Sequence, residues 1–402
     1  MDLHSGTDLQ LTIGEALGTD YFGLREPFTP QQEDYLTRTR AFVDSEVLPV
    51  INDYWERAEF PFALIEKMAP LGIIGDGIEG YGCPPMDPMS AGLINMEIHR
   101  GDGSLGTFIA VQAGLAMQSI AKCGSEEQKQ RWLPPMARLD KIGAFALTEP
   151  EHGSDSVALE TSARRDGESY VINGNKKWIG NGSIADVVVV WARDVADGRV
   201  KGFLVEKGTP GYAARVIEGK GSLRAVWQAE IDLVDVRVPE ANRLPGARSF
   251  RDTAAVLAAT RVSCAWAALG HAVAGYDAAL TYAKRRTQFG KPLVSFQLVQ
   301  NRLVKMLAKV TAMQLYCRRL ADLQAAGTLD ATLAGLAKMH NTSTAREVLA
   351  EARDLLGGNG ILLDFHVIRH MSDIEAIHTY EGTESMQTLI VGRDITGVTA
   401  FA

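Results

Sequence analysis

The sequence predicts a mainly α-helical fold with a β insert, in the order helical domain, β domain, helical bundle. Apolar residues recur at steps of three and four in the first and last parts, which is typical of amphipathic helices. Between them lie short alternating segments separated by Gly-containing turns, which indicate strands. We therefore expect an N-terminal extension at 1–28, a helical domain at 29–141, a β domain at 142–245 and a C-terminal helical bundle at 246–402.

The N-terminal domain is expected to hold long helices. Apolar periodicity favours helices over 31–50 and 89–121. Ser125 followed by Gln128 forms a capping box, which predicts the start of a short helix. Because proline lacks the backbone N–H that a helix interior needs, Pro134-Pro135 predicts where that helix ends.

Two dipeptides in the middle region predict hairpin turns. Asp166-Gly167 and Asn173-Gly174 both have the composition of a tight turn between antiparallel strands. Gly is permissive for the left-handed backbone that such turns require. Further strands are predicted over 187–191, 202–206 and 229–238.

The C-terminal region is expected to form a bundle of long helices between 250 and 356. One helix carries apolar residues in alternating steps of four and three, the pattern of a helix packed in a bundle. Its methionines and its cysteine are predicted to be core residues, without a chemical role. This seam consists of Val299, Leu303, Met306, Val310, Met313, Cys317 and Leu320.

Composition excludes several classes of function. The net charge is −8 and no Lys/Arg-rich run occurs, so a nucleic-acid binder is not expected. The scattered cysteines form no C-x-x-C pair and the histidines lack metal-ligand spacing, so we expect reduced thiols, no metal site and a cytoplasmic location. We expect no secretory signal, no peroxisomal address and, because the apolar runs are short, no membrane span.

The segment Tyr380-Glu381-Gly382-Thr383 is the most informative stretch of the chain. A carboxylate followed by glycine and then by a helix-capping threonine can place a base at a helix entrance, beside exposed backbone donors. Taken alone, Glu381 would be a solvated loop glutamate. Its interpretation as a catalytic base depends on the segments that accompany it.

Four other segments could meet a ligand. The loop that begins with Phe145-Ala146-Leu147-Thr148 and contains Ser154 offers N–H and O–H donors, although alone it would be an ordinary turn. Trp178-Ile179-Gly180 places an aromatic plane near exposed amides, which a buried core tryptophan would explain equally well.

In the C-terminal half, Arg286 ends a helix with a guanidinium suited to a pyrophosphate, or simply makes a surface ion pair. Gln297 begins the next helix, and Gly357-Gly358 permits close backbone approach of a ligand.

Together these segments resemble one family, the flavin-dependent acyl-CoA dehydrogenases. The resemblance runs from Thr29 to Phe401, and it is nearest to the glutaryl-CoA dehydrogenase-like group and the plant short-chain acyl-CoA oxidases. It implies the acyl-CoA dehydrogenase fold: an N-terminal helical domain, a β-barrel-like middle domain and a C-terminal four-helix bundle. The shared words are Ser222-Leu223-Arg224-Ala225, Gln288-Phe289-Gly290, 355–361, 379–383 and 397–401.

The resemblance implies FAD as the cofactor. It also implies that Arg286, Gln297 and 354–358 contact the FAD of a neighbouring subunit, and therefore that the protein is a homotetramer, a dimer of dimers. Ser154 would lie near both the FAD pyrophosphate and the CoA moiety. The positions that match FAD contacts in the family are Phe145, Ala146, Leu147, Thr148, Ser154, Trp178, Ile179, Gly180, Arg286, Gln288, Phe289, Gln297, Asp354, Leu355, Leu356, Gly357, Gly358, Thr383 and Phe401.

For the reaction, the resemblance implies that Glu381 takes the α-proton of an acyl-CoA while hydride leaves the β-carbon for flavin N5. Gly382 would lie against the thioester, and Arg261 matches a substrate-side arginine. Some relatives carry the base on a neighbouring helix, but the matching residue here is Thr260, which cannot accept the proton.

Two departures bear on the substrate and on the electron acceptor. Gly106 and Ala110 stand where the glutaryl branch presents an arginine and a serine to the distal carboxylate, so a short monocarboxylic substrate is favoured, with Arg100 as a candidate replacement charge. Gly180 stands where most family dehydrogenases have threonine, and it is expected to leave room that O₂ could use.

The acceptor stays open between an electron-transfer flavoprotein and O₂. The alternatives to a short-chain dehydrogenase are therefore an acyl-CoA oxidase, a glutaryl-CoA dehydrogenase or, from another class, a non-catalytic acyl-CoA- or flavin-binding assembly protein.

Overall fold

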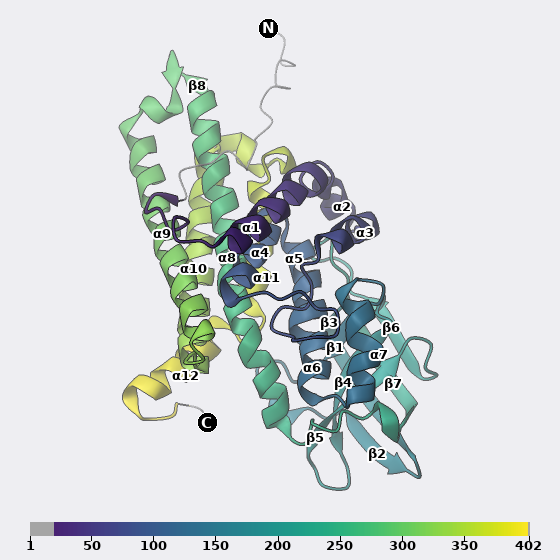
Figure 1. The fold of residues 1–402 in the computed structure, drawn as a ribbon. Helices are drawn as coiled ribbons and strands as arrows, with labels where there is room; N and C mark the ends of the chain where they lie inside the picture. Colours follow the sequence, from purple (N-terminus) through teal and green to yellow (C-terminus); the bar gives the residue numbers. More distant parts are fainter. Residues whose placement is uncertain (1–19, 401–402) are drawn as a thin grey trace.

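The computed structural model describes residues 20–400, so the predicted cofactor residue Phe401 lies outside the described residues. Helical, β and helical parts follow one another along the chain, as predicted (Figure 1). The N-terminal helices are α1 (Pro30–Phe42), α2 (Ile51–Arg57), α3 (Phe62–Met68), α4 (Pro88–Gly101), α5 (Gly103–Ile109), α6 (Gln118–Cys123) and α7 (Glu126–Ala137).

The C-terminal part consists of long helices with a short β ribbon at one end. This ribbon lies at the end of the bundle that is remote from the β domain (Figure 1). The elements are α8 (Phe250–Arg285), β8 (Thr287–Gln288), β9 (Lys291–Pro292), α9 (Gln297–Ala325), α10 (Ala331–Leu355), α11 (Val367–Thr379) and α12 (Glu384–Thr396).

The prediction of one helix over 89–121 is wrong in one respect, because the helix is interrupted at Asp102. This residue has extended backbone (φ −162°, ψ 133°), and its carboxylate accepts a hydrogen bond from Leu105 N–H at 2.8 Å. The same carboxylate receives Arg369 Nη1 at 2.6 Å, and both side chains of this ion pair are fully buried. Asp102 therefore ends α4 and begins α5, held in place by a partner distant in sequence. A π-helical turn, Ala110–Met117, then leads into α6.

The helix predicted to begin after Ser125 is confirmed, but its predicted end is not. The side chain of Ser125 accepts from Gln128 N–H, and the Gln128 side chain accepts from Ser125 N–H. Pro134 and Pro135 lie inside α7, which continues to Ala137. The two prolines remove hydrogen bonds only to the preceding turn, and the last turn of the helix survives their loss.

The middle part is a curled seven-stranded sheet in the order β1-β4-β2-β3-β7-β6, with β5 paired to β4. The Asp166-Gly167 turn is confirmed, since it joins β2 to β3 and Gly167 has φ +63°. The strands are β1 (Gly143–Ala146), β2 (Ser162–Asp166), β3 (Ser169–Gly180), β4 (Val187–Asp194), β5 (Val200–Glu206), β6 (Tyr212–Val216) and β7 (Gln228–Pro239).

The predicted turn at Asn173-Gly174 is wrong, because both residues lie within β3. The register against β7 shifts between Ile172 and Gly174, where the strand bulges. Gly174 has φ +152°, and a Cβ there would meet Thr161 Oγ1 at 2.4 Å. The glycine therefore serves a close backbone approach inside a strand, which the dipeptide alone cannot distinguish from a turn.

The apolar seam of the C-terminal region is confirmed as core. Leu303, Met306, Val310, Met313, Cys317 and Leu320 of α9 are all buried against α8 and α10, whereas Val299 in the first turn is only half-buried.

Two helical stretches of the described residues, 103–123 and α8, are long and apolar enough to cross a membrane, so the expectation that every apolar run is short is wrong. Most of each stretch is buried within the protein, as in the core helix of a soluble domain.

Candidate functional site

A cavity of about 480 Å³ lies where the three parts of the chain meet. Its walls come from the N-terminal helices, from the ends of β1 and β3, from α8 and from the turn between α11 and α12. The structure thus brings together many residues singled out in the sequence. Those on its wall are Ala110, Phe145, Leu147, Thr148, Ser154, Trp178, Ile179, Gly180, Arg261, Glu381, Gly382 and Thr383.

Glu381 occupies the turn between α11 and α12. Its backbone is left-handed (φ +57°), as is that of Gly382 (φ +87°), so two consecutive residues turn the chain sharply. The Thr383 hydroxyl then caps α12 by accepting from Met386 N–H at 3.3 Å. A left-handed non-glycine residue costs free energy and persists only where its surroundings hold it.

The Glu381 carboxylate receives a hydrogen bond from Thr260 Oγ1 at 2.5 Å. Burial raises the pKa of Glu381 above its usual value, while this hydrogen bond and the positive charges of Lys338 and Arg261 act in the opposite direction. A carboxylate with a raised pKa is a stronger base once deprotonated, which suits it to accept a proton from a weak carbon acid.

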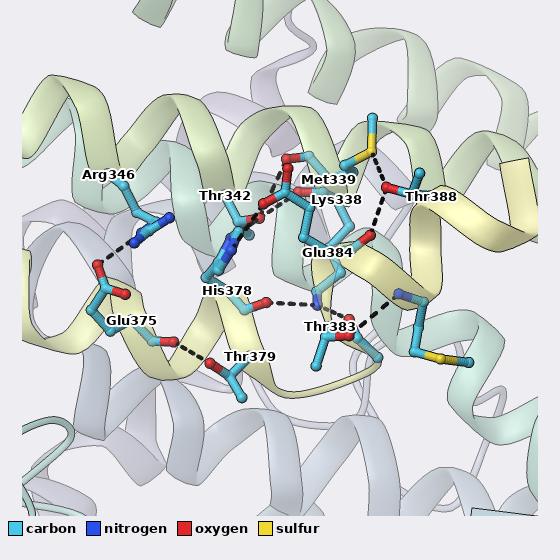
Figure 2. A network of polar contacts seen from close by, with 12 residues as sticks. Lys338, Met339, Thr342, Arg346, Glu375, His378, Thr379, Thr383, Glu384 and Thr388 are labelled. Carbon is cyan, nitrogen blue, oxygen red and sulfur yellow. Dashed lines mark hydrogen bonds and ion pairs between the residues drawn. The ribbon is translucent and has the colours of Figure 1, made fainter. Parts of the chain in front are cut away.

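Lys338 of α10 holds this turn in place. Its side chain is 1% exposed, and Nζ donates to Tyr380 O at 2.5 Å, to His378 O at 3.5 Å and to Gly382 O. Figure 2 shows the lysine extending from its helix toward the backbone between His378 and Thr383. Burial lowers the pKa of Lys338. Its contacts with backbone carbonyls satisfy an amine that no carboxylate pairs with among the described residues.

A second donor completes this support. Gln387 Nε2 of α12 donates to Glu381 O at 3.1 Å and to Gly382 O at 3.2 Å. Sequence reasoning missed Lys338 and Gln387. A signal for Lys338 was present in the sequence, because the helical pattern places this lysine on the buried face of α10. A buried cation needs partners, so such a position indicates a specific contact.

The loop after β1 is held by a buried ion pair. Lys176 Nζ donates to Leu147 O at 2.9 Å and to Glu149 Oε1 at 2.8 Å. The Glu149 carboxylate also accepts from the backbone N–H groups of Glu160 and Thr161, at 2.6 and 2.9 Å. Burial lowers the pKa of Lys176 to about 8, although the charge of Glu149 opposes this shift. Breaking such a buried pair costs about 3–5 kcal/mol, so the loop that carries Thr148 is fixed.

Trp178 is a cavity-facing residue and not a buried core residue. The residue is 55% exposed, has left-handed backbone (φ +63°) and lies on the cavity wall. Ile179, next to it, is buried. Ala146 does not reach the cavity, because it is fully buried inside the sheet.

Gly180 lines the cavity, but the position that a side chain would take there is not empty. A Cβ at this position would meet Val111 Cγ2 at 2.8 Å, so a valine methyl group from the N-terminal domain fills the space. The glycine and the valine are therefore complementary, and a threonine at 180 would require Val111 to move.

The remaining predicted cofactor residues do not line this cavity. Arg286 follows α8, Gln288 and Phe289 form the β8–β9 ribbon, and Gln297 begins α9, at the end of the bundle remote from the β domain (Figure 1). Phe289 is 92% exposed. Asp354 forms an ion pair with Arg302 at 2.8 Å. The segment from Leu355 to Gly358 lies at the same end of the bundle. The residue that follows it, Asn359, donates from Nδ2 to Tyr282 Oη of α8 at 3.0 Å. Predicted FAD residues thus form two separate groups in one chain.

Arg100 does not supply the replacement charge that the sequence suggested for the cavity. This arginine is fully buried and bonded to Glu97 and Asp44, each at 2.7 Å, so it cannot replace a carboxylate-binding charge in the cavity. Gly106 lines a smaller neighbouring cavity of about 180 Å³, and Ala110 lines both. Arg261 contributes to the larger one.

No three His, Cys, Asp or Glu side chains gather as a metal site in the part of the chain that the structure describes. The residues present fit a flavin: Trp178 offers an exposed flat indole, and Thr148 and Ser154 offer hydroxyl donors beside it. Glu381 lines the same cavity.

Comparison with known proteins agrees with this arrangement. Residues 29–140, 144–236 and 250–396 match the family models "Acyl-CoA dehydrogenase, N-terminal domain", "Acyl-CoA dehydrogenase, middle domain" and "Acyl-CoA dehydrogenase, C-terminal domain". The chain is 34% identical over 369 residues to the mitochondrial short-chain specific acyl-CoA dehydrogenase of Bos taurus, covering 90% of this chain and 89% of that protein.

Solved structures are similar over nearly the whole chain. A glutaryl-CoA dehydrogenase from Mycobacterium smegmatis has a TM-score of 0.93 at 39% identity, covering 96% of this chain and 99% of that one. A glutaryl-CoA dehydrogenase from the same organism in complex with FADH2 also has a TM-score of 0.93, at 37% identity and the same coverage. A chain in a structure of the electron transferring flavoprotein of Acidaminococcus fermentans has a TM-score of 0.88 at 31% identity, covering 92% of this chain and 98% of that one. The protein therefore belongs to the acyl-CoA dehydrogenase family, whose enzymes bind FAD and act on the CH–CH group of acyl-CoA.

Proposed function

We propose that this enzyme removes two hydrogens from a short, saturated monocarboxylic acyl-CoA to give the 2-enoyl-CoA, with Glu381 as the catalytic base. The observation that carries the proposal is the Glu381 carboxylate, which lies on the wall of the cavity formed by the flavin-type residues. The left-handed backbone of Glu381 and its support by Lys338 and Gln387 keep the carboxylate at this position.

The α-proton of a thioester is weakly acidic, so its removal needs stabilisation of the enolate oxygen as negative charge develops. The backbone N–H of Glu381 donates to no group among the described residues and is free to bind the thioester oxygen. Glu381 then accepts the α-proton on a carboxylate whose pKa is raised by burial. Thr148, Trp178 and Ser154 on the cavity wall would hold FAD, which would supply a hydride acceptor for the β-carbon.

The substrate assignment depends on what the cavity lacks. Gly106 and Ala110 carry no charge, and Arg100 is engaged in buried ion pairs away from the cavity. A dicarboxylic acyl group would therefore find neither the arginine and serine of the glutaryl branch nor Arg100, and Arg261 is the one Lys or Arg side chain among the residues that line the cavity. A carboxylate buried beyond the reach of Arg261 would cost several kcal/mol. This favours butyryl-like substrates over glutaryl-CoA, although the protein is similar in structure to glutaryl-CoA dehydrogenases.

For the acceptor, we propose an electron-transfer flavoprotein in preference to O₂. Val111 fills the position that a side chain at 180 would take, so the missing threonine side chain adds little extra room for oxygen at that position. The similarity to a chain of an electron transferring flavoprotein structure is a second support. Fast peroxide formation by the reduced enzyme in air would favour the oxidase instead.

We also propose that FAD is completed by a second copy of the chain in a homotetramer. Arg286, Gln297 and the segment from Asp354 to Gly358 lie at the far end of the bundle, where one chain cannot bring them to its own cavity (Figure 1). A cytoplasmic location belongs to the same proposal, and it is supported by the free thiols of the cysteines.

The experiment is an anaerobic titration of the flavin with acyl-CoAs, made on wild-type enzyme and on Glu381→Gln. The amide keeps the shape and the backbone N–H but cannot accept a proton, so flavin content and acyl-CoA binding should persist while the reduction rate falls by about 10²–10⁴. Butyryl-CoA should reduce the wild-type flavin faster than glutaryl-CoA. Reduction of the Glu381→Gln flavin at the wild-type rate would show that another residue is the base.

A further inference from the structure

A second cavity, of about 180 Å³, adjoins the larger one beside the candidate base. The two cavities share wall residues from α4, from the π-helical turn and from α8. One of them, Thr260, donates to the Glu381 carboxylate at 2.5 Å, so the shared wall lies next to the group that would take the α-proton. The shared residues are Asn95, Ala110, Gly114, Thr260 and Ser263.

A short series of contacts leads from this shared wall to Asp76. A Cβ at Gly114 would lie 3.4 Å from Thr260 Cγ2, so the backbone of the glycine faces the threonine with no side chain between them. Gln118 follows about one turn later in the same helical stretch, and its Nε2 donates to Asp76 O at 2.8 Å. Asp76, which lines the second cavity, therefore lies about one helical turn beyond Gly114.

The wall of the second cavity is mainly apolar and carries two charged residues, Asp76 and Lys122. Lys122 is exposed. In a pocket with an apolar wall, the few polar groups orient the ligand and determine which ligand is accepted. The apolar residues of this wall include Ile73, Ile94, Ile98, Ile109, Ala113 and Val262.

The Asp76 carboxylate has no partner on another residue in the part of the chain that the structure describes. Asp76 is half-buried, so it is not sealed within the core. Burial raises the pKa of Asp76 above its usual value, as expected of a carboxylate that is removed from water without a cation beside it. A cationic group delivered into the cavity would supply the missing partner, whereas a second carboxylate would be repelled.

We propose that the second cavity receives the far end of the acyl chain, and that Asp76 selects chains that end in an ammonium group. Such a substrate is an ω-aminoacyl-CoA whose methylene groups contact the apolar wall. Arg261, which would repel an ammonium group, lines the larger cavity and not the second one. This inference rests on the proposed function and deepens it, because it names the charge at the far end of the substrate.

The test compares substrates of equal length that differ only in their terminal group. We would measure kcat/KM for flavin reduction by 6-aminohexanoyl-CoA and 8-aminooctanoyl-CoA, by their hydroxyl analogues and by the dicarboxylic analogues. At one length or both, the wild-type enzyme should prefer the amino over the hydroxyl substrate by about tenfold or more, the size of one charged hydrogen bond. The dicarboxylic substrate should be the slowest of the three.

Asp76→Asn keeps the shape of the side chain and removes its charge, so the ratio of amino to hydroxyl substrate should fall to about one. Ala91→Leu is a second variant, because Ala91 lines the second cavity and not the larger one. The added volume should slow the six- and eight-carbon substrates relative to butyryl-CoA. Glu79→Gln is the matched control, since Glu79 is an exposed acid three residues after Asp76 that lines neither cavity, and it should change neither ratio.

Three results would overturn the inference while butyryl-CoA still reduces the flavin. They are a wild-type enzyme with no preference for the amino substrate at either length, an Asp76→Asn ratio equal to that of wild type, and an unchanged chain-length ratio in Ala91→Leu. A wild-type flavin that butyryl-CoA and every other acyl-CoA leave oxidised would overturn the proposed function, and this inference with it.

Discussion

The protonation state of the Glu381 carboxylate depends on one neighbouring side chain, Thr260 of α8. The Thr260 hydroxyl donates to the carboxylate at 2.5 Å, which stabilises the charged form and lowers a pKa that burial raises. In the family resemblance, Thr260 is only a residue that cannot be the base. Its hydrogen bond shows that it acts on the base.

Thr260→Val should shift the pH dependence of flavin reduction to higher pH. Removal of a hydrogen bond to a charged group costs about 1.5–3 kcal/mol, which corresponds to a rise of about one to two pKa units. Glu381 must be deprotonated to accept the α-proton. The rising limb of the pH–rate profile should therefore move to higher pH by a similar number of pH units. Stopped-flow reduction across pH measures this. Thr253→Val, on the same helix but outside the cavity, is the control, and an unmoved limb would exclude this role of Thr260.

Gly180→Thr should lower the bound FAD and the melting temperature, because its Cβ would lie 2.8 Å from a Val111 methyl group. Overpacking of this kind costs about 1–3 kcal/mol. Combining it with Val111→Ala removes the obstructing methyl groups and should restore flavin content. Absorbance of the purified protein and thermal unfolding measure both effects. Equal FAD content in Gly180→Thr and wild type would mean that the site relaxes without loss.

At the scale of elements, the turn between α11 and α12 is positioned by a helix that contributes nothing to the cavity wall. Lys338 of α10 reaches the carbonyls of this turn (Figure 2), and Gln387 of α12 donates to two carbonyls of the same turn. Around them, His378 lies 3.1 Å from Glu384, which joins the end of α11 to the start of α12. The left-handed conformation of Glu381 is therefore a property of three packed helices.

Lys338→Met should slow flavin reduction about tenfold or more and leave FAD bound, because the turn loses donors to its carbonyls while the flavin-side wall is untouched. Rapid-reaction kinetics and flavin absorbance separate the two quantities. Lys309→Met is the control, since this lysine forms a surface ion pair with Glu347 at 2.6 Å. A wild-type rate in Lys338→Met would show that Gln387 alone is sufficient to hold Glu381.

On the scale of the whole molecule, the predicted FAD residues form two groups at opposite parts of one chain. One group surrounds the cavity between the domains, and the other lies at the β8–β9 end of the bundle (Figure 1). Exposed apolar side chains accompany the second group, as expected of a surface that meets another subunit. They are Phe289, Leu298, Val304, Ile361 and Leu362.

Arg286→Ala should release FAD although Arg286 is remote from the cavity of its own chain. If a second copy supplies this guanidinium to the cofactor, the assembly and the flavin should be lost together on dilution. Flavin absorbance and solution mass, followed on the same samples, measure this. Arg164→Ala, an exposed arginine of β2, should change neither quantity. A stable monomer that retains all of its FAD would refute the coupling.

Local signals in the sequence predicted much of the fold. The capping box at Ser125, the Asp166-Gly167 turn and the apolar seam of α9 all depend on residues a few positions apart, and all three are confirmed. The break at Asp102 and the bulge at Gly174 were missed. Each depends on a partner distant in sequence: Arg369 for Asp102 and Thr161 for Gly174.

The sequence by itself determined the order of helical and β parts, the family, the cofactor and the presence of a candidate base, because periodicity and short motifs are local properties. Only the tertiary structure decided which candidates share a cavity, that Val111 fills the space beside Gly180, and that His99 takes the place of a side chain at 106. The physical reason is close packing. Such contacts join segments tens to hundreds of residues apart, and a shift of one methyl group alters them, whereas a sequence motif specifies only its own neighbours.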